Sequence, residues 1–200
     1  MEKIFLFDQN VRKKTKKELL CGVDEVGRGC IAGPLVSAAV VFSSDVYIPQ
    51  LKESKSVSPK RREKLFKEIL SCAKDVSYSI VATQTINYLN VHRANILAMK
   101  IAVERVKVDF DIVLVDGYEI LGLNKPQLSI IKADIKSAVV AAASIVAKVI
   151  RDRIMVLYDK MFPEYKFLLH KGYATKIHRD IISEVGLSEI HRKYAYKFVS

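Results

Sequence analysis

Four acidic residues of the sequence lie in or beside apolar segments, where a carboxylate is costly unless it pairs or binds a metal. Asp24 and Glu25 interrupt a segment rich in Val and Leu, and Asp116 ends a run of four apolar residues. Asp134 lies between a short apolar segment and a long one. Turn formation by Asp116, or helix capping by Asp134, would explain either residue alone. The four together favour a cluster of hard oxygen ligands for Mg²⁺ or Mn²⁺.

Strand geometry constrains the first two acids. Successive side chains of a regular strand point to opposite faces of a sheet, so Asp24 and Glu25 should diverge. Both can serve one site only if a bulge redirects one of them, or if one acts through its backbone or through a water molecule.

A glycine-rich segment follows these acids, running from Gly27 to Gly33 as GRGCIAG. It does not match a dinucleotide-binding motif, because its spacing is GxGxxxG and a strand-like run beginning at Pro34 follows in place of a helix. Gly27 and Gly29 would let the backbone approach a ligand closely, with Arg28 available for a phosphate. A tight hairpin turn explains these glycines equally well.

The C-terminal part of the sequence combines histidines, basic residues and tyrosines. The spacings of His170, His178 and His191 match no zinc site, and we expect these residues at the polar surface or in contact with nucleic acid. Basic side chains can reach phosphates while aromatic rings stack on sugars or bases. Ordinary surface and core packing is the competing explanation, and nothing local supports a nucleophilic Cys–His pair.

A sheet and its covering helices must bring these residues together, and the order of the elements indicates an α/β arrangement with a mixed sheet. We expect the first two strands to pair as a hairpin. The long helix, rich in small apolar side chains, should lie buried against the sheet and emerge at Arg151–Arg153. The basic run Arg12–Lys17 is expected to be a solvated, mobile arm. The predicted strands are 19–26, 34–42, 75–83, 112–115 and 128–131, and the predicted helices are 60–73, 86–106, 137–158 and a segment near 175–185.

Composition narrows the class of protein. The chain has 200 residues, with 33 Lys and Arg against 22 Asp and Glu, for a formal net charge of +11. This charge favours a polyanionic partner, nucleic acid first and an anionic membrane second. The half-hydrophobic composition argues against a disordered chain, and we expect a single domain over residues 1–200. Three cysteines without a CxxC pattern indicate reduced thiols. No apolar stretch is long enough for a membrane helix or a signal peptide, so a cytoplasmic protein is expected.

A series of motifs runs in unbroken order over about residues 21–192. They are Gly22–Gly29 (GVDEVGRG) with Gly33-Pro34, Leu51–Lys55 (LKESK) with Ser58, Val115-Asp116-Gly117, Lys132-Ala133-Asp134, Ala141–Lys148 (AAASIVAK) with Arg151-Asp152, His170–Thr175 (HKGYAT) and His191-Arg192. Together they resemble the ribonuclease HII family, the type 2 ribonucleases H. The sister family, ribonuclease HIII, lacks this Gly-Arg-Gly and carries an extra N-terminal domain. Three departures bear on the phosphate contacts: Glu53 where Asp is usual, Ala133 where Gly is frequent, and Tyr194–Tyr196 in place of Ser-Phe.

The resemblance implies a ribonuclease H-like fold, a central mixed β-sheet flanked by helices. The catalytic core would span about 18–160, and a C-terminal helical, nucleic-acid-binding part about 161–200. The implied activity is endonucleolytic hydrolysis of the RNA strand of RNA–DNA hybrids. It includes cleavage 5′ of single ribonucleotides embedded in duplex DNA, leaving 3′-hydroxyl and 5′-phosphate ends. We expect a monomer, and we find no glutamine-led aromatic clamp-binding motif near the C-terminus.

The resemblance also implies a role for each motif residue. Asp24, Glu25, Asp116 and Asp134 would be the catalytic, metal-binding carboxylates, with Asp134 favoured by its motif over Asp152. They would hold Mg²⁺ or Mn²⁺, because converging carboxylates repel one another without cations. The catalytic complex would contain two of these ions. A second hypothesis is a non-catalytic RNA–DNA binder on the same fold, which would have no need for four acids in a phosphate groove. The substrate-binding residues would be Gly27, Arg28 and Gly29 at the ribose 2′-hydroxyl, Tyr173 stacking beside it, and Lys55 at a phosphate.

Overall fold

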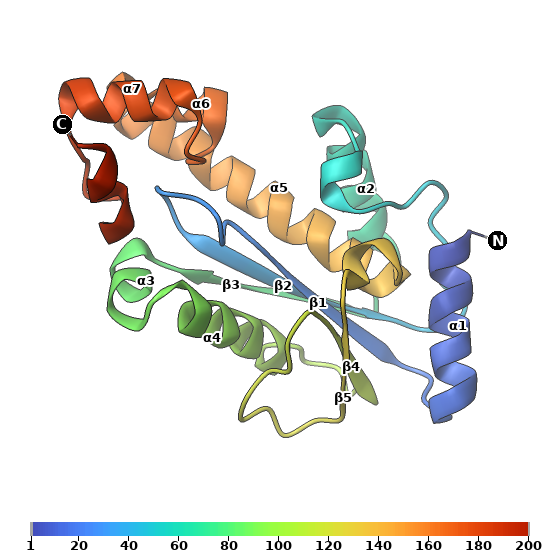
Figure 1. The fold of residues 1–200 in the computed structure, drawn as a ribbon. Helices are drawn as coiled ribbons and strands as arrows, with labels where there is room; N and C mark the ends of the chain where they lie inside the picture. Colours follow the sequence, from blue (N-terminus) through green and yellow to red (C-terminus); the bar gives the residue numbers. More distant parts are fainter. Residues whose placement is uncertain (1, 200) are drawn as a thin grey trace.

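A computed structural model describes residues 2–199 and shows a mixed five-stranded sheet with helices on both faces (Figure 1). The strand order is β3-β2-β1-β4-β5. β1 pairs antiparallel with β2, which pairs antiparallel with β3, whereas β1, β4 and β5 run parallel. The predicted α/β class and the predicted hairpin are therefore confirmed. The strands are β1 (Leu20–Val26), β2 (Leu35–Phe42), β3 (Asp75–Val81), β4 (Ile112–Asp116) and β5 (Gln127–Ile130).

Different helices cover the two faces of the sheet. α1 (Lys3–Thr15), α2 (Pro59–Cys72) and α5 (Ala138–Met161) pack on one face. α3 (Thr83–Leu89) and α4 (Val91–Glu104) pack on the other. α6 (Phe167–His170) and α7 (Lys176–Val185) lie at the far end of α5 from α1 (Figure 1). Short 3₁₀ helices span Ser54–Ser56, Ala133–Ile135, Pro163–Tyr165 and Lys193–Phe198.

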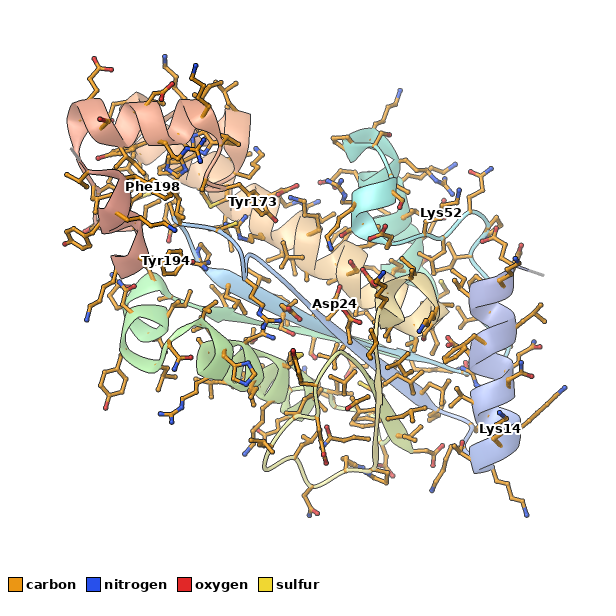
Figure 2. The ribbon with its side chains drawn as sticks, viewed as in Figure 1. Lys14, Asp24, Lys52, Tyr173, Tyr194 and Phe198 are labelled. Carbon is orange, nitrogen blue, oxygen red and sulfur yellow. The ribbon has the colours of Figure 1, made fainter. Side chains whose placement is uncertain are left out.

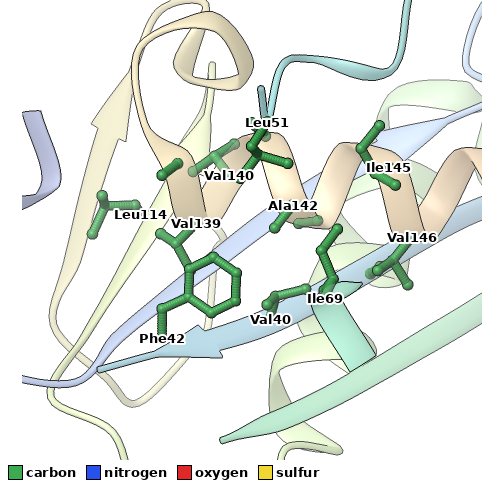
Figure 3. Packing of buried hydrophobic residues seen from close by; sticks show 14 of the residues in the cluster. Val40, Phe42, Leu51, Ile69, Leu114, Val139, Val140, Ala142, Ile145 and Val146 are labelled. Atoms are coloured by element: carbon green, nitrogen blue, oxygen red, sulfur yellow. The ribbon is translucent and has the colours of Figure 1, made fainter. Parts of the chain in front are cut away.

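α5 lies directly on the middle of the sheet, as its small apolar side chains predict. A Cβ atom added to Gly22 of β1 would lie 2.4 Å from the backbone carbon of Val139, so only glycine permits this approach. Side chains of α5 such as Val140 and Ile145 fill the core together with Val40 and Phe42 of β2 (Figure 3). The close contact fixes the N-terminal half of α5 against the strand that carries Asp24.

The N-terminal segment differs from its prediction. Residues Lys3–Thr15 form a helix, so the basic run beginning at Arg12 is not a mobile arm. Phe5 and Val11 are buried against α5. Asp8 is buried as well, and its Oδ2 accepts a hydrogen bond from the Val139 N–H at 2.9 Å. The basic residues conceal this helix in the sequence, although basic side chains in a last turn suit the negative end of the helix dipole.

Two further predictions need correction. The expected single helix over 86–106 is two helices, because Asn90 has φ 68° and its side chain caps the second one by accepting from the N–H groups of His92 and Arg93. Arg151 does not mark the emergence of α5 into solvent but is fully buried. Within residues 2–199, no helix is long and apolar enough to cross a membrane.

Candidate active site

A cavity of about 240 Å³ lies where β1 and β4 end. These parallel neighbours are in register, with Val23 opposite Val115, so the next residues, Asp24 and Asp116, come to the same end of the sheet. All nine residues that the sequence placed in the site line this cavity. They are Asp24, Glu25, Gly27, Arg28, Gly29, Lys55, Asp116, Asp134 and Tyr173. Figure 2 shows Asp24 over the middle of the sheet and Tyr173 toward the C-terminal helices.

Asp24 points toward the α5 side of the sheet and is 6% exposed. Its Oδ1 accepts the N–H of Glu25 at 2.8 Å, and it is hydrogen-bonded to Ser144 of α5. Burial, followed by the charges of Glu25 and Asp116, raises the pKa of Asp24 well above its usual range. Ionisation of Asp24 is therefore unfavourable in free energy, and a bound cation would reduce this penalty.

Glu25 points to the opposite face, as the strand geometry requires. The pairing of β1 with β2 continues without interruption through Asp24 and Glu25, so no bulge redirects either side chain. The Glu25 carboxylate is hydrogen-bonded to Asn95, a buried residue of α4. Burial raises the pKa of Glu25, whereas the Asn95 hydrogen bond and the Arg28 charge lower it. Glu25 thus reaches the cavity from the α4 side.

The other two acids are joined by the backbone. Oδ1 of Asp116 accepts the N–H of Ala133 at 2.6 Å, which fixes the short turn carrying Asp134 beside the end of β4. Burial, then the charges of Asp116 and Glu53, raises the pKa of Asp134. Glu53 is also hydrogen-bonded to Asp134, which places a fifth carboxyl group near the site.

The donor set fits a divalent cation. It consists of carboxylate oxygens, the ligands that Mg²⁺ and Mn²⁺ prefer. In two of the acids, Asp24 and Asp116, only one of the two carboxylate oxygens accepts a backbone N–H. Among residues 2–199, no three acidic, histidine or cysteine side chains are grouped closely enough to surround an ion without moving.

Lys55 is held at the cavity by contacts of its turn with α5 and α2. Oγ of Ser54 lies 2.9 Å from Oγ of Ser144, and the Arg62 guanidinium donates to the Ser54 carbonyl at 2.9 and 3.1 Å. Asp152 pairs with Arg62 at 3.3 Å and with Lys148 at 2.7 Å. Asp152 is thus occupied in ion pairs, and the cavity is lined by Asp134 instead.

The glycine-rich loop is fixed from behind by two fully buried arginines. A Cβ atom at Gly27, whose φ is 100°, would lie 2.4 Å from Nε of Arg151, whereas one at Gly29 would meet no atom within 4 Å. Arg192 donates to the carbonyls of Gly33, at 3.0 and 3.1 Å, and of Arg28, at 3.2 Å. Arg151 joins the loop to the C-terminal part through the carbonyls of Ala32, Pro34 and Lys171. We call this contact of residues 27–34 with residues 171–173 and 191–194 the loop joint.

The expected place of the histidines was wrong. His170, His178 and His191 are buried in the C-terminal part, where their rings contact one another. His170 ends α6 and His178 lies on the buried face of α7 beside Ile182, but the C-terminal segments against which these helices pack are distant in sequence, so their burial could not be read from the histidine spacing.

Sequence reasoning also missed several residues of the site. Ser144 and Lys148 line the cavity, and both fall within the AAASIVAK motif, which was therefore an available signal. Asn95 has no such signal, since it lies outside the recognised motifs and the sequence shows it only as a polar residue in a helix. Its role appears only when α4 is placed beneath Glu25.

Comparison with known proteins gives consistent matches. The ribonuclease HII family matches over residues 21–198. The ribonuclease HII of Caldicellulosiruptor saccharolyticus is 47% identical over 192 residues, which cover 96% of this chain and 93% of that protein. The ribonuclease HII in the PCNA complex from Archaeoglobus fulgidus is 27% identical with a TM-score of 0.76, covering 90% and 95% of the two chains. Ribonuclease H2 from Pyrococcus horikoshii, at 24% identity, shares the fold with a TM-score of 0.74, covering 90% of this chain and 96% of that one.

Proposed function

The chain belongs to the ribonuclease HII family, and we propose that the four carboxylates lining its cavity carry out the hydrolysis for which this family is named. The chain is accordingly a metal-dependent endoribonuclease that cleaves the RNA of RNA–DNA hybrids and ribonucleotides in DNA. The observation that carries the assignment of residues is the gathering of all nine predicted residues in one cavity.

The carboxylates would hold Mg²⁺ or Mn²⁺, two ions in the catalytic complex, through Asp24, Asp116 and Asp134. Glu25 would act from the α4 face, through its side chain or its backbone. The bound cations supply charge neutralisation at the scissile phosphate and an activated water. The chain itself orients the acids, through the Glu25 and Ala133 N–H groups and Ser144.

Substrate selection follows from the loop and the basic side chains of the cavity. Gly27, Arg28 and Gly29 present backbone and guanidinium groups close to the acids, which suits recognition of the 2′-hydroxyl that distinguishes a ribonucleotide from its neighbours. Lys55 suits a phosphate, and the half-exposed ring of Tyr173 suits stacking. Membership of the family leads us to propose cleavage on the 5′ side of the ribonucleotide, leaving a 3′-hydroxyl and a 5′-phosphate.

The C-terminal part, about residues 161–200, would bind nucleic acid beside the catalytic core of about residues 18–160. The loop joint supports this assignment, because it attaches Tyr173 of the C-terminal part to the glycine-rich loop of the catalytic core. We place the enzyme in the cytoplasm as a monomer. The Archaeoglobus relative is in complex with PCNA, whereas this chain has no glutamine-led aromatic motif in its C-terminal sequence.

A duplex DNA containing a single ribonucleotide tests the proposed function. We expect cleavage 5′ of the ribonucleotide with Mg²⁺ or Mn²⁺ and none with EDTA. An all-DNA duplex of the same sequence is the control and should stay intact. Binding of the ribonucleotide duplex without metal-dependent cleavage would refute the catalytic assignment and leave only a binding protein.

A further inference from the structure

Two buried histidines outside the cavity, together with the partly buried Ser188, form a chain that ends at the backbone of Tyr173. Nδ1 of His178 lies 2.9 Å from the Tyr173 carbonyl oxygen. Nε2 of His178 lies 3.0 Å from Nε2 of His191. Nδ1 of His191 lies 2.9 Å from the backbone nitrogen and 2.8 Å from the hydroxyl of Ser188. Each contact is within hydrogen-bond distance.

The groups at the two ends of this chain determine which nitrogen of each histidine ring carries the proton. A carbonyl oxygen only accepts, so Nδ1 of His178 carries the proton and its Nε2 accepts. A backbone N–H only donates, so Nδ1 of His191 accepts and its Nε2 carries the proton. The two rings then meet as one donor and one acceptor. Both histidines are neutral, and the chain runs in one direction from Ser188 to Tyr173.

Protonation of either ring would break the chain. A proton on Nε2 of His178 would face the Nε2–H of His191, and a proton on Nδ1 of His191 would face the Ser188 N–H. Burial accordingly lowers the pKa of both His178 and His191 to about 4. His178 is fully buried, so no water competes for its partners. The arrangement is therefore fixed throughout the neutral pH range.

The segment before Tyr173 is held as firmly. Nδ1 of His170 accepts the Gly172 N–H at 3.2 Å, while its Nε2 lies 2.9 Å from the Tyr165 carbonyl and must donate to it. The Gly172 carbonyl accepts from the N–H groups of Ile31 and Ala32 in the loop joint. The Tyr173 carbonyl also accepts the Thr175 N–H at 2.8 Å, so both of its lone pairs are used.

We propose that His178 and His191 are positioning residues for substrate recognition, since their hydrogen-bond chain fixes the backbone from which the Tyr173 ring reaches the cavity. This inference rests on the proposed function, in which Tyr173 stacks on the nucleic acid. Neither histidine lines the cavity, so each acts through Tyr173. Tyr173 is 38% exposed, so its ring is accessible from the cavity beside Lys148 and Arg151 while its backbone is held.

Amide substitutions test the proposed direction of the chain. Asn at position 178 places an N–H where Nδ1 stands, whereas Gln places its amide where Nε2 stands. We expect His178→Gln to raise KM for the ribonucleotide duplex about tenfold with little change in kcat, and His178→Asn to recover most of this loss. His191→Gln, which keeps an N–H at the position of Nε2, should be milder than His191→Asn. A variant that is merely unstable would lower apparent kcat through loss of active enzyme and leave KM unchanged; this outcome, or equal KM values for His178→Asn and His178→Gln, would overturn the proposal.

A double-mutant cycle separates positioning from a general effect. In the Tyr173→Ala background, His178→Gln should raise KM no further, because the ring that it positions is gone. Additive effects of the two substitutions on KM would contradict the inference.

A single tryptophan distinguishes this inference from the proposed function. The chain contains no tryptophan, so Tyr173→Trp introduces a unique fluorophore at the position in question. Without nucleic acid, His178→Gln should increase acrylamide quenching of this tryptophan, and unchanged quenching would overturn the positioning role. If quenching changes while Tyr173→Ala leaves KM unchanged, the histidines do position residue 173, and it is the stacking role of Tyr173 that fails.

Discussion

The acidic cavity and the loop joint are both buried and polar, but they treat charge in opposite ways. In the cavity, Asp24 and its neighbouring acids raise one another's cost of ionisation. In the loop joint, the fully buried guanidinium groups of Arg151 and Arg192 have their donors satisfied by backbone carbonyls. We propose that the cavity is complete only with a bound cation, whereas the joint is complete by itself. One region is built for chemistry and the other to hold it in shape.

The largest expected effect comes from the cavity. Asp116→Asn keeps a carbonyl oxygen to accept the Ala133 N–H but removes a charge. We expect cleavage of the ribonucleotide duplex to fall about 10³-fold or more, since cation binding is lost. Substrate binding, measured by fluorescence anisotropy, should persist. Circular dichroism confirms the fold, and wild-type turnover by a folded Asp116→Asn protein would show that the carboxylate assignment is wrong.

A substitution in the loop joint should lower the free energy of unfolding. Arg192→Leu leaves the carbonyls of Gly33 and Arg28 without their donors, as well as the hydroxyl of Tyr194. Unsatisfied buried acceptors each cost about 1–3 kcal/mol, and we expect the free energy of unfolding to fall by about 4 kcal/mol. Urea denaturation measures it. A loss below about 1 kcal/mol would mean that the joint is not held by this side chain.

Asp8 offers a single buried acid for comparison with the acidic cluster. Burial raises its pKa from 3.8 to about 6. A group with a raised folded pKa contributes its stability below the unfolded pKa and loses it as pH rises through the folded pKa. Between about pH 4 and 6, the wild type should therefore lose about 3 kcal/mol relative to Asp8→Asn.

Denaturation of both proteins across this pH range measures the difference. The acids of the cavity are present in both chains and cancel in the comparison. A constant difference between wild type and Asp8→Asn from pH 4 to 7 would contradict the assignment of a raised pKa to Asp8.

The smallest effect is expected beneath Glu25. Asn95→Ala removes the hydrogen bond that holds the Glu25 carboxylate. One lost hydrogen bond is worth about 1 kcal/mol, which predicts about a fivefold fall in kcat and a higher Mg²⁺ concentration for half-maximal activity. Asn95→Asp is the sharper comparison, because it adds a like charge and should be worse than Asn95→Ala. Equal activity of the three proteins at limiting Mg²⁺ would remove Asn95 from the site.

The acidic cavity was predictable from sequence, whereas the joint was not. Carboxylates such as Asp116 stand out because they contradict the apolar runs around them, and the register of β1 with β4 then brings them together. The divergence of Asp24 and Glu25 also follows from strand geometry alone. These signals are local, so a single sequence reveals them.

The features that escaped prediction depend on contacts between distant segments. Arg151 reads as a surface residue until the carbonyls of Ala32 and Lys171 are seen around it. His178 reads as a solvated basic residue until His191 supplies its partner. The helix over Lys3–Thr15 is likewise stabilised by packing on α5, which its own basic composition conceals.

Thermal unfolding with and without cations tests the contrast between the two regions most directly. In EDTA, Asp116→Asn should unfold at a higher temperature than the wild type, because one repelling charge is gone. At Mg²⁺ or Mn²⁺ concentrations about 100 times the dissociation constant, the wild type should gain about 2.7 kcal/mol, or about 5–10 °C. Asp116→Asn should gain much less. An equal cation-induced shift in both proteins, or none in the wild type, would contradict the account of the cavity as a cation site.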